Sequence, residues 1–522
     1  MQVGGVVKPN TYRDSVALML LSTRLAELPG VRQASAMMGT PANREILAAT
    51  GLLADALQDA RPNDLCLAVE ATDEDALQRT LEEAERLLAA GPGAPAEGGG
   101  AVGVHVRPRT LESALRLRPE ANLALISVPG EYAAFEARRA LRRGLHVFLF
   151  SDNVPLEDEV ALKRLAQQLG LLVMGPDCGT ALIGGAPLGF ANAVRRGSIG
   201  IVASSGTGLQ EVSCLIDRLG EGISHALGTG SRDLSAQVGG ITFLAALNAL
   251  AEDDSTRVLA LIAKPGAPEV EARVWERLSS ADKPAVAYFL SRSGVERLGE
   301  RVVVAADLEH AARCAVALAR GERPPTAGTT RVAAEQMAQK IVADLAPGQR
   351  VVSGLFAGGT LAQEAALAIQ RALGAAAGGP PREAQAGEVL NASGHRIVDL
   401  GDDAFTRGRP HPLIDWRLRN EQLVEQAGRG NVALFLLDVV LGYGTHPNPA
   451  EALRPGLERA REATARAGAR LHVLASICGT DADPQGYQRQ RQALEDLGIV
   501  VAESSSAAAL VAGRVAGLLS QG

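Results

Sequence analysis

The sequence predicts an α/β protein in which a small α/β N-terminal domain precedes domains built on parallel sheets. Apolar runs of four to eight residues alternate with helix-like stretches, which is typical of buried parallel strands in βα units. One strand–turn–helix pattern also occurs twice, as IGIVASSGTGLQE at 199–211 and RVVSGLFAGGTLAQE at 350–364. Three further apolar runs follow each copy in the same order. We therefore expect two flavodoxin-like domains, at 197–320 and 331–522.

The earlier part of the chain divides at a flexible segment, GPGAPAEGGGA at 91–101. Before it we expect an N-terminal domain, 1–90, with strands at 2–7, 31–38 and 64–70 and helices at 13–28, 43–58 and 73–90. After it we expect a further α/β domain, 101–196, with strands within 101–106, 121–130, 145–152 and 170–180. A Gly/Pro-containing linker, GERPPTAG, separates the two flavodoxin-like domains.

Composition limits the function classes. The 522 residues are 47% hydrophobic and 21% charged, as in folded proteins, and the net charge of −7 argues against a nucleic-acid partner. The apolar stretches are too short to span a membrane, and the first residues lack a signal-peptide layout. The five cysteines are scattered, which indicates neither a metal site nor a disulfide framework. We expect a cytoplasmic protein without a membrane partner.

The duplicated turns are the candidate phosphate site. In each copy a strand stops at small residues and a helix begins at once, so free backbone N–H groups and the positive end of a helix dipole point at one spot. Two unrelated βα turns remain the alternative. The predicted phosphate-binding residues are Ser204, Ser205, Gly206, Thr207, Gly208, Gly358, Gly359 and Thr360.

The segment GDDAFTRGRPHPLID at 401–415 is the candidate substrate site. Arginine can hold a carboxylate with two hydrogen bonds, and a histidine can carry a proton near neutral pH. We predict His411, Arg409 and Asp415 as catalytic, and Asp402, Asp403 and Arg407 as substrate-binding, together with Arg232 and Asp233 in the equivalent loop of the first repeat. The alternative is that these charges pair with one another at a domain interface.

Three acidic or nucleophilic side chains have two interpretations each. GPDCGT at 175–180 ends a strand, so Asp177 and Cys178 are candidate substrate contacts; Cys178 is either a nucleophile or a small buried side chain. Glu211 and Glu364, in the first helical turns after the duplicated pattern, either orient a partner's loop or complement the helix dipole.

Several of these motifs resemble known families. GLLVMGPDCGTALI, GSIGIVASSGTGLQE and LGTGSRDLS resemble the α subunit of succinyl-CoA synthetase, and the second repeat resembles a domain of its β subunit. MMGTPAN, FSDNVPLEDE, VMGPDCGT, GDDAFTRGRPHPLID and LDVVLGYG resemble the FdrA family over nearly the whole chain. The resemblance implies a Rossmann-like, CoA-binding-type domain at 101–196 and succinyl-CoA synthetase-like flavodoxin domains after it.

The departures from succinyl-CoA synthetase limit what the resemblance implies. That enzyme relays phosphate through a loop histidine, whereas the matching stretch here, SRSGVERLGERVVV at 291–304, has none. The sequence also shows no ATP-grasp region and no Gly-rich CoA turn after the strand at 101–106. The resemblance retains the pair of helix N-termini that, in succinyl-CoA synthetase, face each other across the phosphorylated loop. We therefore expect a phosphate to sit between the turns 204–208 and 357–360.

Three functions remain open from the sequence. The resemblance to the oxamate carbamoyltransferase component implies a subunit that transfers a carbamoyl or acyl group with partner proteins, on an acyl phosphate and an oxamate-like acid. The second possibility is an acyl-CoA synthetase component that needs a separate nucleotide-binding subunit, with CoA as its cofactor. The third is a scaffold without catalysis.

Overall fold

The structure is a computed structural model that describes residues 2–13, 15–90, 108–290, 297–298, 301–327, 331–374, 387–406 and 410–521. Within these ranges, no helix has both the length and the apolar character needed to cross a membrane. The chain forms two compact units. One contains Met1–Asn122, Ser127–Pro129 and Thr406–Asp415; the other contains Leu123–Ile126, Gly130–Phe405 and Trp416–Gly522.

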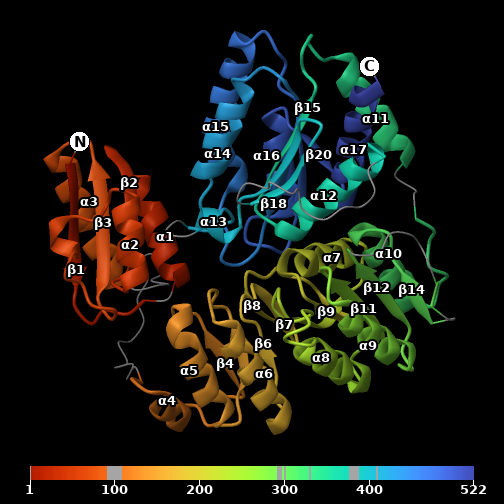
Figure 1. Ribbon diagram of the computed structural model, residues 1–522, viewed down its shortest axis with the longest axis horizontal. Coiled ribbons are helices and arrows are strands. Elements are labelled where there is room, and N and C mark those ends of the chain that lie inside the picture. The colour runs from red at the N-terminus through yellow and green to blue at the C-terminus, as the bar shows by residue number, and fades with distance from the viewer. Residues whose placement is uncertain are drawn as a thin grey trace. The chain divides into compact units, whose positions relative to one another are not determined.

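The N-terminal domain is a three-stranded antiparallel sheet with helices on both faces (Figure 1). Its strand order is β1-β3-β2. Leucines of α1 pack on one face, and Leu47 of α2 and Leu57 pack on the other. The elements are β1 (Gln2–Lys8), α1 (Ser15–Ala26), β2 (Val31–Met38), α2 (Pro41–Ala49), the 3-10 turn η1 (Asp55–Leu57), β3 (Leu65–Ala71) and α3 (Glu74–Ala90).

The helix expected over 43–58 was wrong in length. The chain forms α2 and η1 there, because the helix ends at Ala49 and residues 50–54 make a turn that returns the backbone toward the sheet. The hydroxyl of Thr40 caps α2 by accepting a hydrogen bond from the Asn43 amide at 3.2 Å. The short helix α4 (Leu111–Leu117) also belongs to this unit.

The second unit begins with a parallel sheet in the order β4-β5-β6, flanked by α5 and α6. The first strand expected for this domain, within 101–106, lies outside the described residues. A hairpin, β7–β8, then joins the next sheet. The elements are β4 (Leu123–Ile126), α5 (Gly130–Leu141), β5 (His146–Leu149), α6 (Leu156–Leu169), β6 (Val173–Met174), β7 (Thr180–Ile183) and β8 (Ala186–Gly189).

The first flavodoxin-like domain has five parallel strands in the order β10-β9-β11-β12-β14, which is the 2-1-3-4-5 order of that fold. The antiparallel strand β7 extends it beside β10, and β13 pairs with β14 at the other edge. The elements are β9 (Arg196–Ala203), α7 (Gly206–Arg218), β10 (Ile223–Gly228), α8 (Ile241–Glu252), β11 (Val258–Ala263), α9 (Pro268–Ser279), β12 (Ala285–Phe289), β13 (Arg297–Leu298), β14 (Val302–Val304) and α10 (Leu308–Ala319).

The second flavodoxin-like domain repeats this order as β17-β15-β18-β19-β20, again with an antiparallel strand, β16, beside its second strand. The elements are α11 (Arg331–Ala343), β15 (Val351–Phe356), α12 (Gly359–Ala372), β16 (Glu388–Ala392), β17 (His395–Asp399), α13 (Asp403–Thr406), α14 (Arg417–Ala427), β18 (Val432–Val440), α15 (Pro449–Arg466), β19 (Val473–Cys478), α16 (Tyr487–Asp496), β20 (Val500–Ala502) and α17 (Ser505–Gln521). The predicted fold class and duplication are thus confirmed.

Candidate functional site

The first duplicated turn joins β9 to α7 and is capped by its own hydroxyls. Ser205 is the N-cap residue, and its Oγ accepts a hydrogen bond from the Gly208 amide at 2.9 Å. Ser204 Oγ accepts one from the Lys264 amide at 3.0 Å, which fixes the end of β11 beside the turn. The amides of Gly206 and Thr207 are first-turn groups without an intrahelical acceptor. Their residues are half-buried, so this edge of the turn is open to solvent.

The second turn joins β15 to α12 and is capped by a carboxylate instead. Asp438 in β18 accepts hydrogen bonds from the amides of Ala357, at 2.8 Å, and Gly358, at 2.7 Å. Asp438 is fully buried and pairs with the buried guanidinium of Arg419 at 2.9 Å. Because a buried carboxylate already faces this helix end, part of its positive potential is used within the protein.

The two turns touch each other directly. The hydroxyls of Ser205 and Thr360 are hydrogen-bonded to one another, and a Cβ placed on Gly358 would lie 3.0 Å from the Thr207 side chain. The helices α7 and α12 therefore meet at their N-termini, as in Figure 1.

The contact changes which predicted phosphate residues face solvent. Five of the eight are buried and engaged within the fold: Ser204, Ser205, Gly208, Gly358 and Thr360. The remaining three, Gly206, Thr207 and Gly359, form a half-buried edge. A phosphate enclosed between the turns does not fit this packing, whereas an anion lying along the edge does.

Two further side chains border that edge. A Cβ added to Gly359 would lie 2.5 Å from Asp399 Oδ2 and 3.9 Å from Lys264 Nζ, so the carboxylate and the ammonium flank the start of α12. Lys264 follows β11, and Asp399 ends β17. We name this group of residues the strand-end junction; it consists of Asp177, Gly206, Thr207, Lys264, Gly359 and Asp399.

Asp399 has the electrostatics of a proton donor near neutral pH. Burial raises the pKa of its carboxyl group to about 7, against the opposing effects of Lys264 and of the Gly401 amide. Asp438 and Asp402 raise it further. Oδ1 accepts the Gly401 hydrogen bond at 2.9 Å. Oδ2 is the oxygen next to Gly359 and therefore faces the open edge.

Asp177 also lies near Lys264. Its Oδ2 accepts a hydrogen bond from the Ser231 hydroxyl at 2.8 Å, and it keeps an exposed surface. The surrounding protein, which displaces water from the group, raises the pKa of Asp177; Asp403 adds to that effect and Lys264 opposes it. Of the predicted substrate residues, Asp177 belongs to the strand-end junction, and Asp402 and Asp403 lie near it. All three are exposed.

Arg232 and Asp233 occupy a different network. Asp233 has no exposed surface and pairs with the buried Lys163 at 2.7 Å, while its oxygens also accept hydrogen bonds from the amides of Thr242 and Phe243. Arg232 pairs with the buried Glu159 at 2.9 Å. These contacts match the alternative in which the charges pair with one another, and the burial of Asp233 does not suit a substrate contact.

Cys178 is unsuited to nucleophilic catalysis. Its side chain is buried, and burial raises the pKa of the thiol to about 12, so it stays protonated at neutral pH. The residue packs in the core of the first flavodoxin-like domain. This corrects the interpretation of Cys178 as a substrate-binding or reactive side chain.

The predicted catalytic segment is in the other compact unit. His411 and Asp415 lie there, with His411 Nδ1 accepting a hydrogen bond from the Leu413 amide at 3.2 Å and Asp415 buried. Arg407 and Arg409 lie outside the described residues. His411 and Asp415 therefore belong to a different unit from the strand-end junction.

Sequence reasoning missed Lys264, Asp399 and Asp438. The signal was available in part, because each lies at or near the carboxyl end of a parallel strand, where α/β sheets bind ligands. Nothing in the sequence distinguishes them from other strand-end charges, since their proximity depends on how the two repeats pack.

Comparison with known proteins identifies the family. The family model described as "AllF, heavy metal-associated domain" matches residues 1–102, and the one described as "CoA-ligase" matches residues 355–515. The uncharacterized protein YahF of Escherichia coli K12 is 41% identical over 518 residues, which cover 98% of each chain. The chain belongs to the YahF family. It joins an AllF-type N-terminal domain to a CoA-ligase domain.

More distant relatives agree with this architecture. The alpha 1 subunit of succinate–CoA ligase from Archaeoglobus fulgidus is 27% identical over 220 residues, 40% of this chain and 74% of that one. The crystal structure of PH0766 from Pyrococcus horikoshii covers 76% of this chain and 83% of its own, at 15% identity and a TM-score of 0.31, too remote to add to the fold described above. The relationship to succinate–CoA ligase alpha subunits thus rests on sequence.

The N-terminal family name refers to heavy metals, but the described part of this chain holds no cluster of three or more His, Cys, Asp or Glu side chains that would suit a metal ion. The cysteine of the N-terminal domain, Cys66, is fully buried in β3, and burial raises the pKa of its thiol to about 11.

Proposed function

We propose that the chain is an FdrA-like subunit of a carbamoyltransferase complex that interconverts oxalurate plus phosphate with oxamate plus carbamoyl phosphate, or carries out a related acyl-phosphate transfer. The proposal rests on the FdrA resemblance and on the strand-end junction. The single observation that carries it is the juxtaposition of two helix N-termini with Lys264 and Asp399.

The open edge suits a phosphate dianion. The amides of Gly206 and Thr207 can donate to its oxygens, and Lys264 supplies a full positive charge. Each helix end favours an anion by about 0.3–1 kcal/mol, and the end of α12 contributes less because Asp438 already faces it. Asp399 does not oppose binding while it is protonated, and a bound dianion would raise its pKa further.

Asp399 then has a role in proton transfer. A phosphate oxygen attacks the carbamoyl carbon of oxalurate, the C–N bond breaks, and the oxamate nitrogen must receive a proton. The Asp399 carboxylic acid supplies it, and the carboxylate that results takes the proton that the phosphate releases. Such a step needs a group with a pKa near the working pH, together with fixed donors that position the reactants.

Acyl-CoA ligation with a separate nucleotide-binding subunit is the second candidate. The CoA-ligase match and the succinate–CoA ligase relatives favour it. One strand-to-helix turn, MMGTPAN at 37–43, is a candidate for holding the CoA phosphates. The turn MMGTPAN is closed, since Thr40 caps Asn43 and a Cβ on Gly39 would lie 2.5 Å from the Arg61 carbonyl oxygen. We therefore derive no step through CoA.

Ligand binding to the purified chain distinguishes the two functions. Phosphate and carbamoyl phosphate should raise the melting temperature, whereas ATP-Mg²⁺ and CoA should not; a ligand at about 100 times its Kd adds roughly 2.7 kcal/mol to the free energy of unfolding. Lys264→Met should weaken phosphate binding by roughly tenfold or more, because it removes a charged donor. Stabilisation by CoA alone would instead support the ligase.

A further inference from the structure

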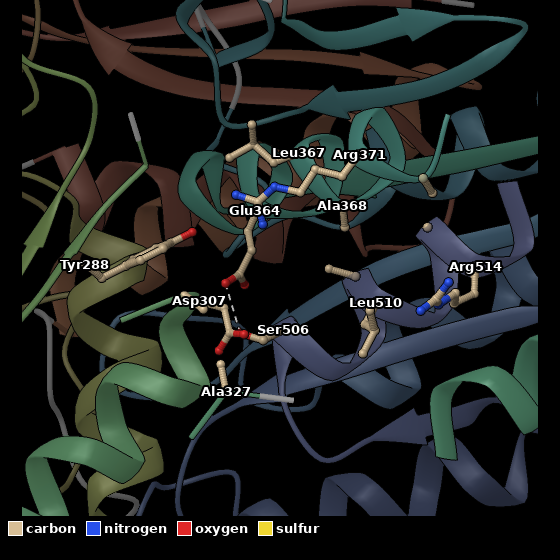
Figure 2. A pocket seen from close by; sticks show the side chains of 14 residues that line it. Tyr288, Asp307, Ala327, Glu364, Leu367, Ala368, Arg371, Ser506, Leu510 and Arg514 are labelled. Carbon is tan, nitrogen blue, oxygen red and sulfur yellow. Dashed lines mark hydrogen bonds between the residues drawn. The ribbon is translucent and has the colours of Figure 1, made fainter. Parts of the chain in front are cut away.

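A cavity of about 330 Å³ lies where the two flavodoxin-like domains meet, and none of its lining residues belongs to the strand-end junction (Figure 2). Helices α12 and α17 of the second domain form two of its walls. Residues around β12 and the start of α10, in the first domain, close it. Its volume is at the lower end of the range for small-molecule sites. Its lining includes Tyr288, Asp307, Glu364, Arg371, Ser506 and Leu510.

One end of the cavity is polar, and not all of its hydrogen-bonding groups have a partner. Glu364 Oε1 accepts hydrogen bonds from the Leu308 amide at 3.0 Å and from the Ser506 hydroxyl at 2.9 Å. Glu364 is 5% exposed, and its Oε2 is buried with no hydrogen-bond partner among the described residues. In Figure 2 the Glu364 carboxylate lies between the Tyr288 hydroxyl and Ser506.

Tyr288 and Asp307 face the same end. The Tyr288 ring is buried, and its hydroxyl points toward Glu364 without a hydrogen-bond partner in the part of the chain that the structure describes (Figure 2). Asp307 caps α10 through a 2.7 Å hydrogen bond from the His310 amide, which engages one of its carboxylate oxygens. Two carboxyl groups and one hydroxyl thus share a small space.

The rest of the cavity is apolar, with the aliphatic side chains of Leu367 and Leu510 and small residues of α12 and α17. Two arginines also border it. Arg514 pairs with Glu335 at 3.3 Å, so its charge is already balanced. Arg371 is exposed, and in Figure 2 its guanidinium extends toward the Tyr288 and Glu364 end of the cavity. Burial raises the pKa of Asp307, and the charge of Arg371 opposes that effect.

Neighbouring buried carboxyl groups repel each other and lose hydration. Arg371 borders these groups, yet Glu364 Oε2 has no hydrogen-bond partner among the described residues. An ammonium group placed among them would relieve both costs and donate up to three hydrogen bonds. We propose that the cavity binds a small molecule with a primary ammonium group on a short aliphatic body. The ammonium contacts Glu364, Asp307 and the Tyr288 hydroxyl, and the body packs on Leu367 and Leu510.

The first repeat offers a matched comparison. Glu211 occupies the equivalent position on α7, and its Oε1 accepts a hydrogen bond from the Ser505 amide at 2.9 Å, just as Glu364 caps α10. Glu211 is also buried and lies near an arginine, Arg218, but it does not line the cavity. Substitution of Glu211 therefore removes a buried carboxylate without touching the ammonium site, whereas substitution of Glu364 removes both.

Occupancy would connect the two repeats. The ligand would touch Tyr288 and Asp307 of the first domain and Glu364 of the second. Glu364 lies on α12 five residues after Gly359, so the same rigid helix begins at the strand-end junction.

The test is calorimetric titration of the full chain with n-butylammonium, L-leucine and butyrate at matched ionic strength. We expect n-butylammonium to bind and butyrate not to bind; tighter binding of L-leucine would show that its carboxylate reaches Arg371. Glu364→Gln should weaken n-butylammonium binding by roughly tenfold or more, and Glu211→Gln should leave it within about twofold.

Tyr288→Phe provides a second variant if Glu364→Gln does not fold, and it should weaken binding by several-fold. The proposal is overturned if n-butylammonium fails to bind the wild-type chain. Equal binding of butyrate, or unchanged affinity in Glu364→Gln or in Tyr288→Phe, would also overturn it.

Discussion

The two flavodoxin-like repeats have the same strand order but different residues at three equivalent strand-end positions. The register of β9 and β15 with their neighbours aligns these positions. In the first repeat they hold glycine, isoleucine and lysine; in the second they hold two aspartates and a valine. The pairs are Gly228 and Asp399, Ile262 and Asp438, and Lys264 and Val440.

Because of this difference, each repeat contributes different charged groups to the strand-end junction. The first repeat contributes a cation and a helix end that a serine caps, so its potential for an anion is retained. The second contributes an acid with a raised pKa and a helix end that a buried carboxylate already faces. The two repeats thus differ at single strand-end positions, and neither repeat alone contains the whole strand-end junction.

The largest expected effect comes from removing the acid of the second repeat. Asp399→Asn should lower the turnover number for phosphate-dependent transfer by about 10²–10⁴-fold, the usual contribution of general acid–base catalysis. The pH profile of the wild type should show a group with a pKa of about 7, and the variant should lack it. The measurement is turnover with the partner subunits present.

Asp254→Asn, an exposed substitution in a loop of the first repeat, is the control and should leave both turnover and the pH profile unchanged. An Asp399→Asn chain with normal turnover would remove Asp399 from the mechanism, while phosphate binding by the same chain would still support the site. Absence of turnover in the wild type would instead reject the proposed reaction.

The buried pair of the second repeat should dominate stability. Asp438→Asn leaves the Arg419 guanidinium buried without a counter-ion, which we expect to cost about 3–5 kcal/mol of unfolding free energy. The equivalent change in the first repeat, Ile262→Val, should cost only about 0.5–1.5 kcal/mol. Thermal or urea denaturation compares them; similar losses would mean that the carboxylate cap is not what distinguishes the repeats.

Stability should also depend on pH through Glu364. Burial and Asp307 raise the pKa of this carboxyl group to about 8, well above its value of about 4.3 in an unfolded chain. The folded state therefore binds more protons between these pH values, so the unfolding free energy should fall as pH rises, by up to about 1.4 kcal/mol per pH unit.

Glu364→Gln should make that slope shallower between pH 5 and 8 in denaturation experiments at about unit pH intervals. Glu462→Gln, at an exposed position on α15, serves as the control and should keep the wild-type slope. An unchanged slope in Glu364→Gln would mean that this carboxyl group does not take up a proton on folding.

The smallest expected effects come from substituting one glycine in each duplicated turn, Gly206 in the first and Gly359 in the second. A Cβ at Gly206 would meet Thr180 Oγ1 at an ordinary 3.5 Å, so Gly206→Ala should fold normally and weaken phosphate binding by about threefold to tenfold, as one hindered donor would. At Gly359 the Cβ would displace Asp399, so Gly359→Ala should lower turnover more than affinity. Titration and kinetics on both variants test this; matching effects would contradict the asymmetry.

Local pattern predicted much of the architecture. The repeated strand–turn–helix at 199–211 and 350–364 predicted both flavodoxin-like domains, because buried strands and N-capped helices depend mainly on neighbouring residues. The helix over 43–58 was wrong, since a tertiary turn after Ala49 interrupts a stretch whose composition favours helix. The predicted pairing of the two helix ends was observed, but not the space expected between them.

The sequence by itself determined the α/β class, the duplication and the small-residue turns at the two helix ends, because these follow from short-range periodicity and from turn chemistry. Only the tertiary structure decided which residues face solvent at those turns and which charges gather there. Lys264 and Asp399 are 135 positions apart, by subtraction of their numbers, and lie close together because the duplicated turns of the two domains are in contact. Such proximity depends on packing across the whole fold, and burial then sets the pKa of Asp399.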